Sequence, residues 1–154
     1  IIFTSLGYAN GSGDEAKYNS KLTVVHPDLK QYVDDYVYLL ESNGIRIPFG
    51  EDLTIISMSC VLPSRVLGIA WGMDIDNITS IDINETAFWY LTKNQRRFLV
   101  YHEISHDIFN LEHHSTPIMT TPMPGYIDQV MIEIMIDRLI NHLKDENKWI
   151  YQIK

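Results

Sequence analysis

The chain has 154 residues, twelve basic and twenty acidic side chains, and a formal net charge of −8. This length fits one compact domain, and the acidic balance without any run of lysine or arginine argues against a surface that tracks nucleic-acid phosphates. The single cysteine, Cys60, excludes an internal disulfide framework and a zinc site built from several cysteines. No apolar run is long enough to span a bilayer, so we expect no membrane span.

The first part of the chain divides into an arm and a helix. Residues 1–21 are predicted to form an N-terminal arm, because residues 10–20 are the only linker-like stretch of the sequence. Residues 22–154 are then expected to form one domain. From Pro27 a helix is predicted, and Gly44 suits its C-terminal end. Apolar residues recur at the spacing of one helix face: Leu29, Tyr32, Val33, Tyr36, Val37 and Leu40.

Three short stretches that follow this helix are predicted to be strands. They are Leu53–Ser59, Val66–Met73 and Thr79–Ile83. The first is rich in β-branched residues, whereas Gly68 and Gly72 weaken the second. We interpret the stretch Thr79–Asn84 as an edge strand. It would then either pair with an extended peptide or be an ordinary edge strand, and its six residues do not decide between the two.

Two further helices are predicted in the second half. One begins at Thr92, since Thr92 and Gln95 form the pattern of a capping box, and it runs to about Asn110. An irregular loop is predicted next, because three prolines and one glycine follow: Pro117, Pro122, Pro124 and Gly125. The last helix, about Ile127 to Lys144, is amphipathic and is expected to pack in the core rather than to anchor in a membrane. Its apolar residues include Val130, Met131, Ile134, Met135, Leu139 and Leu143.

Four of the six histidines lie within thirteen residues. They are His102, His106, His113 and His114. In a helix, the spacing of His102 and His106 puts both imidazoles on one face, where both can bind a single zinc ion. Glu103 is offset by one residue, so it projects beside the metal and can act as a general base on zinc-bound water. The alternative is a solvated helix whose histidines happen to be stacked.

A catalytic zinc site of this kind needs a third protein ligand. We expect the helix to break near Phe109 and Asn110, because asparagine tolerates the left-handed conformation that ends helices. The chain could then turn back and bring His113 to the metal. The alternatives are His114, which would otherwise lie on the surface or support the ligands from behind, and Glu112, since carboxylates also bind zinc.

At this point the sequence resembles the metzincin clan of zinc metallopeptidases. The clan's pattern is HExxHxxGxxH, followed by a turn that contains a methionine below the metal. The stretch from His102 to His113, with Ser115–Pro122 after it, is similar to this motif with its Met-turn. The resemblance implies that Met119 forms the hydrophobic floor under the zinc without binding it, with Met123 as the fallback. Met119 could equally be a gap-filling core residue.

The sequence departs from the metzincin pattern at two positions. Phe109 stands where the family has glycine, and His113 comes seven residues after His106 rather than six. The ending from Asn110 to His113 is similar to a variant in small metallopeptidase-like proteins of Bacteroidetes-type bacteria. There, asparagine takes over the turn that glycine makes elsewhere.

These observations predict an α/β (α+β) domain with a small twisted mixed sheet. The helix from Pro27 would back this sheet, the HExxH helix would lie beneath it, and the Met-turn and the C-terminal helix would close the lower side. The resemblance implies a zinc metalloendopeptidase that binds Zn²⁺ through His102, His106 and His113. Glu103 would serve as the base in the hydrolysis of a peptide or protein substrate.

The competing hypotheses are a non-catalytic zinc-binding module, such as a component of a surface or virion assembly, and a zinc hydrolase of non-peptide amides. We expect a monomer that binds no nucleic acid. Resemblance also implies an exported protein, whether periplasmic, surface-attached or secreted.

Overall fold

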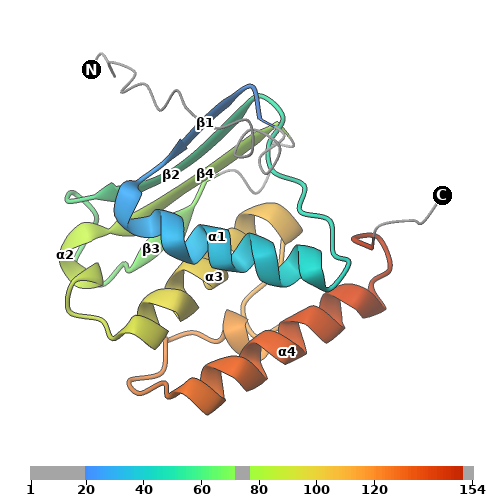
Figure 1. Ribbon diagram of the computed structural model, residues 1–154. Coiled ribbons are helices and arrows are strands. Elements are labelled where there is room, and N and C mark those ends of the chain that lie inside the picture. Colours follow the sequence, from blue (N-terminus) through green and yellow to red (C-terminus); the bar gives the residue numbers. More distant parts are fainter. Residues whose placement is uncertain (1–19, 72–76, 151–154) are drawn as a thin grey trace.

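Four short strands form one mixed sheet, and the three long helices lie on one side of it (Figure 1). The computed structural model describes residues 20–71 and 77–150. The strands are β1 (Leu22–Val25), β2 (Leu53–Ser59), β3 (Gly68–Ala70) and β4 (Ile78–Asn84). Their order across the sheet is β1-β2-β4-β3, in which β1, β2 and β4 run parallel and β3 runs antiparallel to β4.

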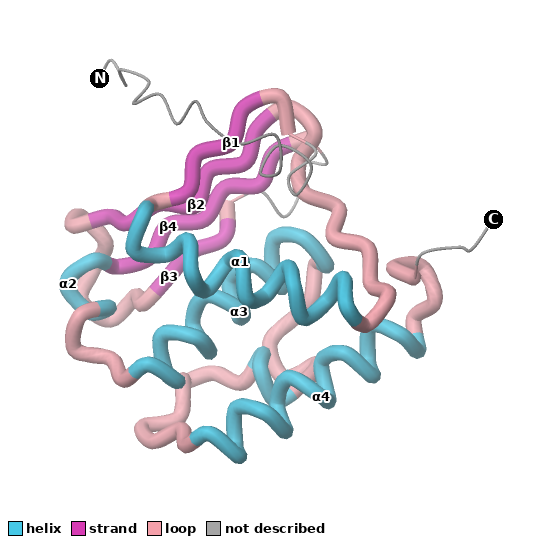
Figure 2. Tube along the Cα trace, in the orientation of Figure 1, coloured by secondary structure: helices cyan, strands magenta, loops and turns pink. Residues whose placement is uncertain are grey.

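The three long helices follow the order expected from the sequence, and two short helices, α2 (Glu85–Phe88) and the 3₁₀ helix η1 (Pro117–Met119), were not predicted. The long helices are α1 (Pro27–Ser42), α3 (Lys93–Phe109) and α4 (Gln129–Asp145). Helices α1 and α3 pack beneath the sheet, and Figure 2 shows the loop after α3 running between α3 and α4. This arrangement confirms the predicted α+β class.

The core lies between the sheet and the helices. All six apolar residues on the predicted face of α1 are buried, from Leu29 to Leu40. Alternate residues of the inner strands, such as Ile56, Ile81 and Ile83, point to the same core and are almost fully buried. The side chains of Leu22 and Val24 in β1 are exposed. Burial therefore follows the alternation expected of a sheet that helices cover on one face.

The interpretation of Thr79–Asn84 as an edge strand is wrong. This segment is β4, which pairs with β2 on one side and with β3 on the other. The edge strands of the described sheet are β1 and the three-residue β3, which is shorter than the predicted strand Val66–Met73. The error arises because alternation along a strand reports which face is covered and contains no information on strand order. Residues 72–76 lie outside the described part of the chain, and so does the end of that predicted strand.

The predicted arm, residues 1–21, lies outside the described residues except for its last two positions. Ser20 and Lys21 already belong with the sheet, because the Lys21 amide donates to the carbonyl of Glu51 at 2.8 Å. The Nζ of Lys21 also donates to Asp52 at 2.7 Å. Strand β1 follows directly and was not predicted. It has only four residues, the first three of which are exposed, so the sequence offers too short a pattern to mark it as a strand.

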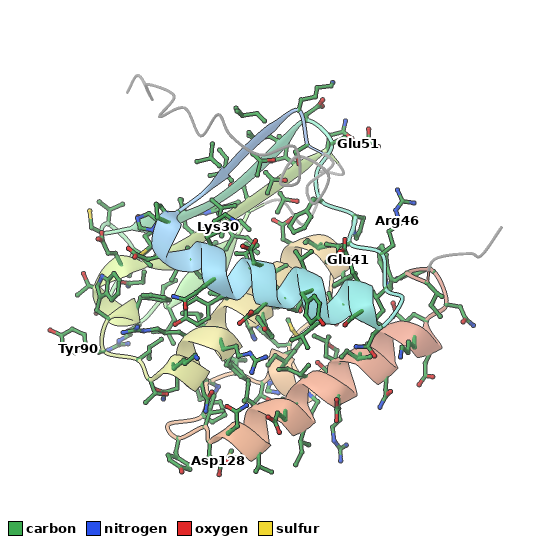
Figure 3. The ribbon with its side chains drawn as sticks, viewed as in Figure 1. Lys30, Glu41, Arg46, Glu51, Tyr90 and Asp128 are labelled. Atoms are coloured by element: carbon green, nitrogen blue, oxygen red, sulfur yellow. The ribbon has the colours of Figure 1, made fainter. Side chains whose placement is uncertain are left out.

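Helix α4 packs one face in the core and exposes part of its apolar surface. Of the apolar residues noted in the sequence, Leu139 and Leu143 are buried, whereas Val130 is 62% exposed and Ile134 is 50% exposed. The buried face consists of Ile132, Ile136, Leu139, Ile140 and Leu143. Asp128 caps the helix by accepting from the Met131 amide at 2.8 Å, and Figure 3 labels it at the start of α4. Within the described residues, no helix has both the length and the apolar character needed to cross a membrane.

The segment after α1 is joined to the segment after α4. Ile45 and Ile150 form an antiparallel bridge, and the Arg46 amide donates to the carbonyl of Trp149 at 2.6 Å. The side chain of Arg46 is exposed and points away from the body of the molecule (Figure 3). Nearby, the Nζ of Lys144 donates to the side-chain oxygen of Asn43 at 3.2 Å. These contacts fasten the end of α4 to the end of α1.

The start of α3 is fixed by the predicted capping box. The Thr92 side chain accepts from the Gln95 amide at 3.3 Å, and the Gln95 side chain accepts from the Thr92 amide at 3.0 Å. The side-chain nitrogen Nε2 of Gln95 also donates to the backbone carbonyl of Gly125 at 3.0 Å. The cap therefore ties the first turn of α3 to the loop that precedes α4.

We expect Thr92→Ala to lower the free energy of unfolding by about 1 kcal/mol, the usual effect of losing an N-cap side chain. Urea denaturation followed by circular dichroism measures this change. Thr86→Ala is the matched control, because Thr86 is exposed within α2. Equal changes in the two variants would contradict the capping role.

Candidate metal centre

Helix α3 carries two histidines whose rings are held by the loop that follows the helix. The exposed fractions of His102 and His106 are only 7% and 8%. The Nδ1 atom of His102 lies 2.9 Å from the carbonyl oxygen of Ile118, and that of His106 lies 2.6 Å from the carbonyl oxygen of Leu111. A carbonyl oxygen only accepts, so each Nδ1 carries the proton and donates it. In the neutral ring the lone pair is then on Nε2.

The two Nε2 atoms face each other at 3.0 Å. Burial lowers the pKa of His102 to about 4 and also lowers the pKa of His106, so both rings are neutral near pH 7. Two neutral rings with protonated Nδ1 atoms place lone pair against lone pair at this distance. Such an arrangement is repulsive unless a cation lies between the two nitrogens. The geometry therefore fits a metal ion and does not fit a simple histidine–histidine hydrogen bond.

A third histidine completes a group of ligand atoms. His102, His106 and His113 each offer a ring nitrogen, and these nitrogens lie within 4.8 Å of one another. The His113 ring centroid is 4.6 Å from that of His106 and 5.3 Å from that of His102. Among the described residues, no other group of three such side chains has this spacing. Neither His114 nor Glu112, the two alternatives from the sequence, belongs to it.

A left-handed turn at Asn110 brings His113 to the other two histidines. Asn110 has φ 52° and ψ 39°, and its amide donates to the carbonyl of Ser105. Helix α3 ends at Phe109, as the sequence predicted. The next residue, Leu111, is buried, and its carbonyl is the one that accepts from His106. One turn therefore both orients the ring of His106 and returns the chain toward the site.

The segment of the predicted Met-turn lies directly behind His102. Ile118 and Met119, in η1, are both 0% exposed, and the Ile118 carbonyl orients the His102 ring. The Met119 carbonyl accepts from the amide of His114 at 2.9 Å, which closes the loop on itself. Met123, the fallback for the Met-turn residue, is only partly buried at the border of the core. Met119 is thus the better placed of the two to lie under the histidines.

The carboxyl group of Glu103 is buried beside the histidines. Its side chain is 6% exposed, and burial raises its pKa to about 7. No hydrogen bond or ion pair within the described part of the chain accompanies this burial. A buried carboxyl without a partner is costly to keep in a core. Such perturbed groups cluster at functional sites.

Two residues that support the site were missed by reasoning from the sequence. The hydroxyls of Ser105 and Tyr36 lie 2.7 Å apart, and both side chains are buried. This contact joins α1 to the turn of α3 that lies between the two histidines. A signal was present, because Ser105 is a small polar residue in a buried stretch and Tyr36 lies on the predicted buried face of α1. Pairing the two required knowing that these helices touch.

Comparison of the chain with protein-family models, with curated proteins and with solved structures gave no match.

The turn at Asn110 yields a test of how the third histidine is placed. Asn110→Ala should lower the free energy of unfolding by about 1–2 kcal/mol, because an alanine pays the full cost of the left-handed conformation. Asn110→Gly should keep both stability and metal affinity, since glycine adopts this conformation freely. Urea denaturation and titration calorimetry with zinc measure the two quantities. Asn141→Ala, on the exposed side of α4, is the control, and equal effects at positions 110 and 141 would contradict the turn's role.

Proposed function

We propose that this protein is a zinc-dependent metallopeptidase. The observation that carries the proposal is the pair of Nε2 lone pairs, from His102 and His106, that face each other at 3.0 Å beside the buried carboxyl of Glu103. A metal explains the facing lone pairs, and a reaction that needs a base explains the unpaired carboxyl.

The donor set suits zinc. Three imidazole nitrogens are the ligands of many catalytic zinc sites, in which a fourth position is left for water or substrate. The Nδ1 protons of His102 and His106 are held by carbonyl groups, as is usual for zinc-binding histidines. When bound, zinc supplies a Lewis acid that polarises a carbonyl group and lowers the pKa of water at the open position. His113 is exposed, so solvent and substrate can reach the histidine group on its side.

Glu103 supplies the proton chemistry. Its carboxylate takes a proton from the attacking water and passes it to the nitrogen of the leaving amine as the C–N bond breaks. A pKa near 7 suits both steps, because the group then accepts and releases a proton with similar ease at neutral pH. The carboxylate side chain follows His102 directly, so it lies beside the metal ligands and not among them.

A peptide substrate is favoured by the free edge of β3. In the antiparallel pair with β4, Leu67 and Trp71 make the hydrogen bonds to Asn84 and Ser80. Residues between them alternate, so Gly68 and Ala70 direct their N–H and C=O groups away from β4. An extended peptide can add to such an edge as a further strand. We therefore assign to β3 the pairing with an extended peptide that the sequence suggested for Thr79–Asn84.

The resemblance to metzincins supports the proposal through the position of the turn. In the clan's pattern the third histidine follows the glycine by three residues, and here His113 follows Asn110 by three. Phe109 is then one extra helical residue, which accounts for both departures from the pattern at once. The burial of Met119 next to the carbonyl that holds His102 supports the role that the resemblance implies for a Met-turn methionine.

Metal binding is tested by changing the adjacent histidines one at a time. His113→Ala should weaken zinc binding by at least 100-fold, because it removes one of three ligands. His114→Ala should leave the affinity unchanged, since that ring is outside the ligand group. Titration with a competing zinc chelator measures both affinities. A loss of zinc in the His114 variant alone would transfer the ligand role to His114.

Catalysis is tested by removing the base. Glu103→Gln should retain one zinc per chain and lower the rate of peptide hydrolysis by about 100- to 10,000-fold, the usual contribution of a general base. Cleavage of a quenched fluorescent peptide library measures the rate, and elemental analysis measures the zinc. Glu41→Gln is the control, because Glu41 is exposed on α1 far along the sequence from the histidines (Figure 3).

The same experiment separates the proposal from its alternatives. A wild-type protein that binds zinc but cleaves no peptide would favour a non-catalytic module or an amidase of other substrates. A Glu103→Gln variant with undiminished cleavage would overturn the mechanism.

A further inference from the structure

Gly68 lies where the edge strand crosses the catalytic helix. A methyl group added at this glycine would lie 2.7 Å from Cγ of Glu103, 2.8 Å from its Oε1 and 2.9 Å from its Cδ. These distances are shorter than carbon atoms tolerate without movement. The space that any other residue would fill at position 68 is therefore occupied by the carboxyl group of Glu103.

The need for glycine at this position comes from Glu103 and not from the backbone. Gly68 does not have the positive φ that favours glycine, in contrast to Gly44 with φ 75°. Gly50 offers a second comparison, since the atoms around its missing side chain belong to the backbone of Ile78 and Thr79. At Gly68 the nearest atoms all belong to the end of one side chain. A methyl group there would displace the carboxylate and would not break the strand.

Gly68 also lies on the edge of β3 that is proposed to bind the peptide. The N–H and C=O groups of Gly68 point away from β4, toward the open side of the sheet. Gly68 therefore leaves empty the space that the carboxyl of Glu103 occupies, and its backbone N–H and C=O groups face an incoming peptide. The distance between the Glu103 carboxylate and a peptide bound at β3 therefore depends on how closely Glu103 approaches this strand.

We propose that Gly68 is a positioning residue, whose missing side chain lets the Glu103 carboxylate lie against the edge strand within reach of the bound peptide. This inference rests on the proposed peptidase function. Gly68 itself takes no part in the chemistry. It acts through Glu103, and it does so because a carboxylate displaced by about 1 Å loses its alignment with the water and the leaving nitrogen.

Peptide hydrolysis by a Gly68→Ala variant tests the positioning role. The variant should keep one zinc per chain, keep KM within about threefold and lower kcat by about 100-fold, the effect expected of a displacement near 1 Å. Gly125→Ala is the matched control, because its added methyl group meets no atom within 4 Å. The shorter Glu103→Asp substitution should cost less activity in the Gly68→Ala background than in the wild type, since an aspartate leaves room for the methyl group.

A second readout does not depend on activity. In the zinc-free protein, Gly68→Ala should lower Tm by several degrees when Glu103 is present. In the Glu103→Ala background the same substitution should leave Tm unchanged or raise it, because the methyl group then fills the vacated space. Differential scanning calorimetry of the four proteins measures this coupling. Equal shifts of Tm in the two backgrounds would overturn the contact.

The two readouts separate the inference from the function on which it rests. If the wild type hydrolyses no peptide while the Tm shifts are coupled, the peptidase proposal fails and the contact stands as a packing feature only. If the wild type is active and Gly68→Ala is as active, the positioning role is overturned.

Discussion

Two backbone carbonyl groups, those of Leu111 and Ile118, decide which nitrogen of each helical histidine carries a proton. The helix spacing alone brings His102 and His106 to the same face, but a histidine with its proton on Nε2 would be useless as a ligand there. Because each Nδ1 donates to a carbonyl, both lone pairs converge on one point. The chemistry of the site therefore depends on the loop after α3 as much as on the helix that carries the ligands.

The rest of the molecule fixes the position of the loop after α3 relative to α3 itself. Helix α4 packs on η1, so it supports the carbonyl that orients His102. Helix α1 contacts the turn of α3 that lies between His102 and His106, through the hydrogen bond of Tyr36 with Ser105. The sheet supplies the third side, where β3 meets Glu103. Each layer of the fold thus contacts a different part of the site, and together the layers keep the carboxyl of Glu103 buried beside the three histidines.

Local patterns predicted the helices and the histidine pair well, because both depend on spacing within one element. The capping box at Thr92 and the left-handed turn at Asn110 were recognised from residue type alone. The edge position of Thr79–Asn84 was wrong and the short strand β1 was missed, because both depend on which elements meet. The same reason hid Gly68. Its role is visible only once the edge strand is placed against α3, and within the sequence it only weakened the prediction of a strand.

The bridge between Ile45 and Ile150 gives the chain a fixed order of assembly. Its neighbouring contact joins Asn43 to Lys144, which are 101 positions apart, so closing this loop costs more chain entropy than any pairing within the sheet. During synthesis the bridge between Ile45 and Ile150 can form only after residues 45–150 have all left the ribosome. Every residue of the histidine site and its loop, up to Met119, emerges before that moment. The site can therefore begin to assemble while α4 is still being made, and the bridge then joins the ends of α1 and α4 in a structure that already contains the three histidines.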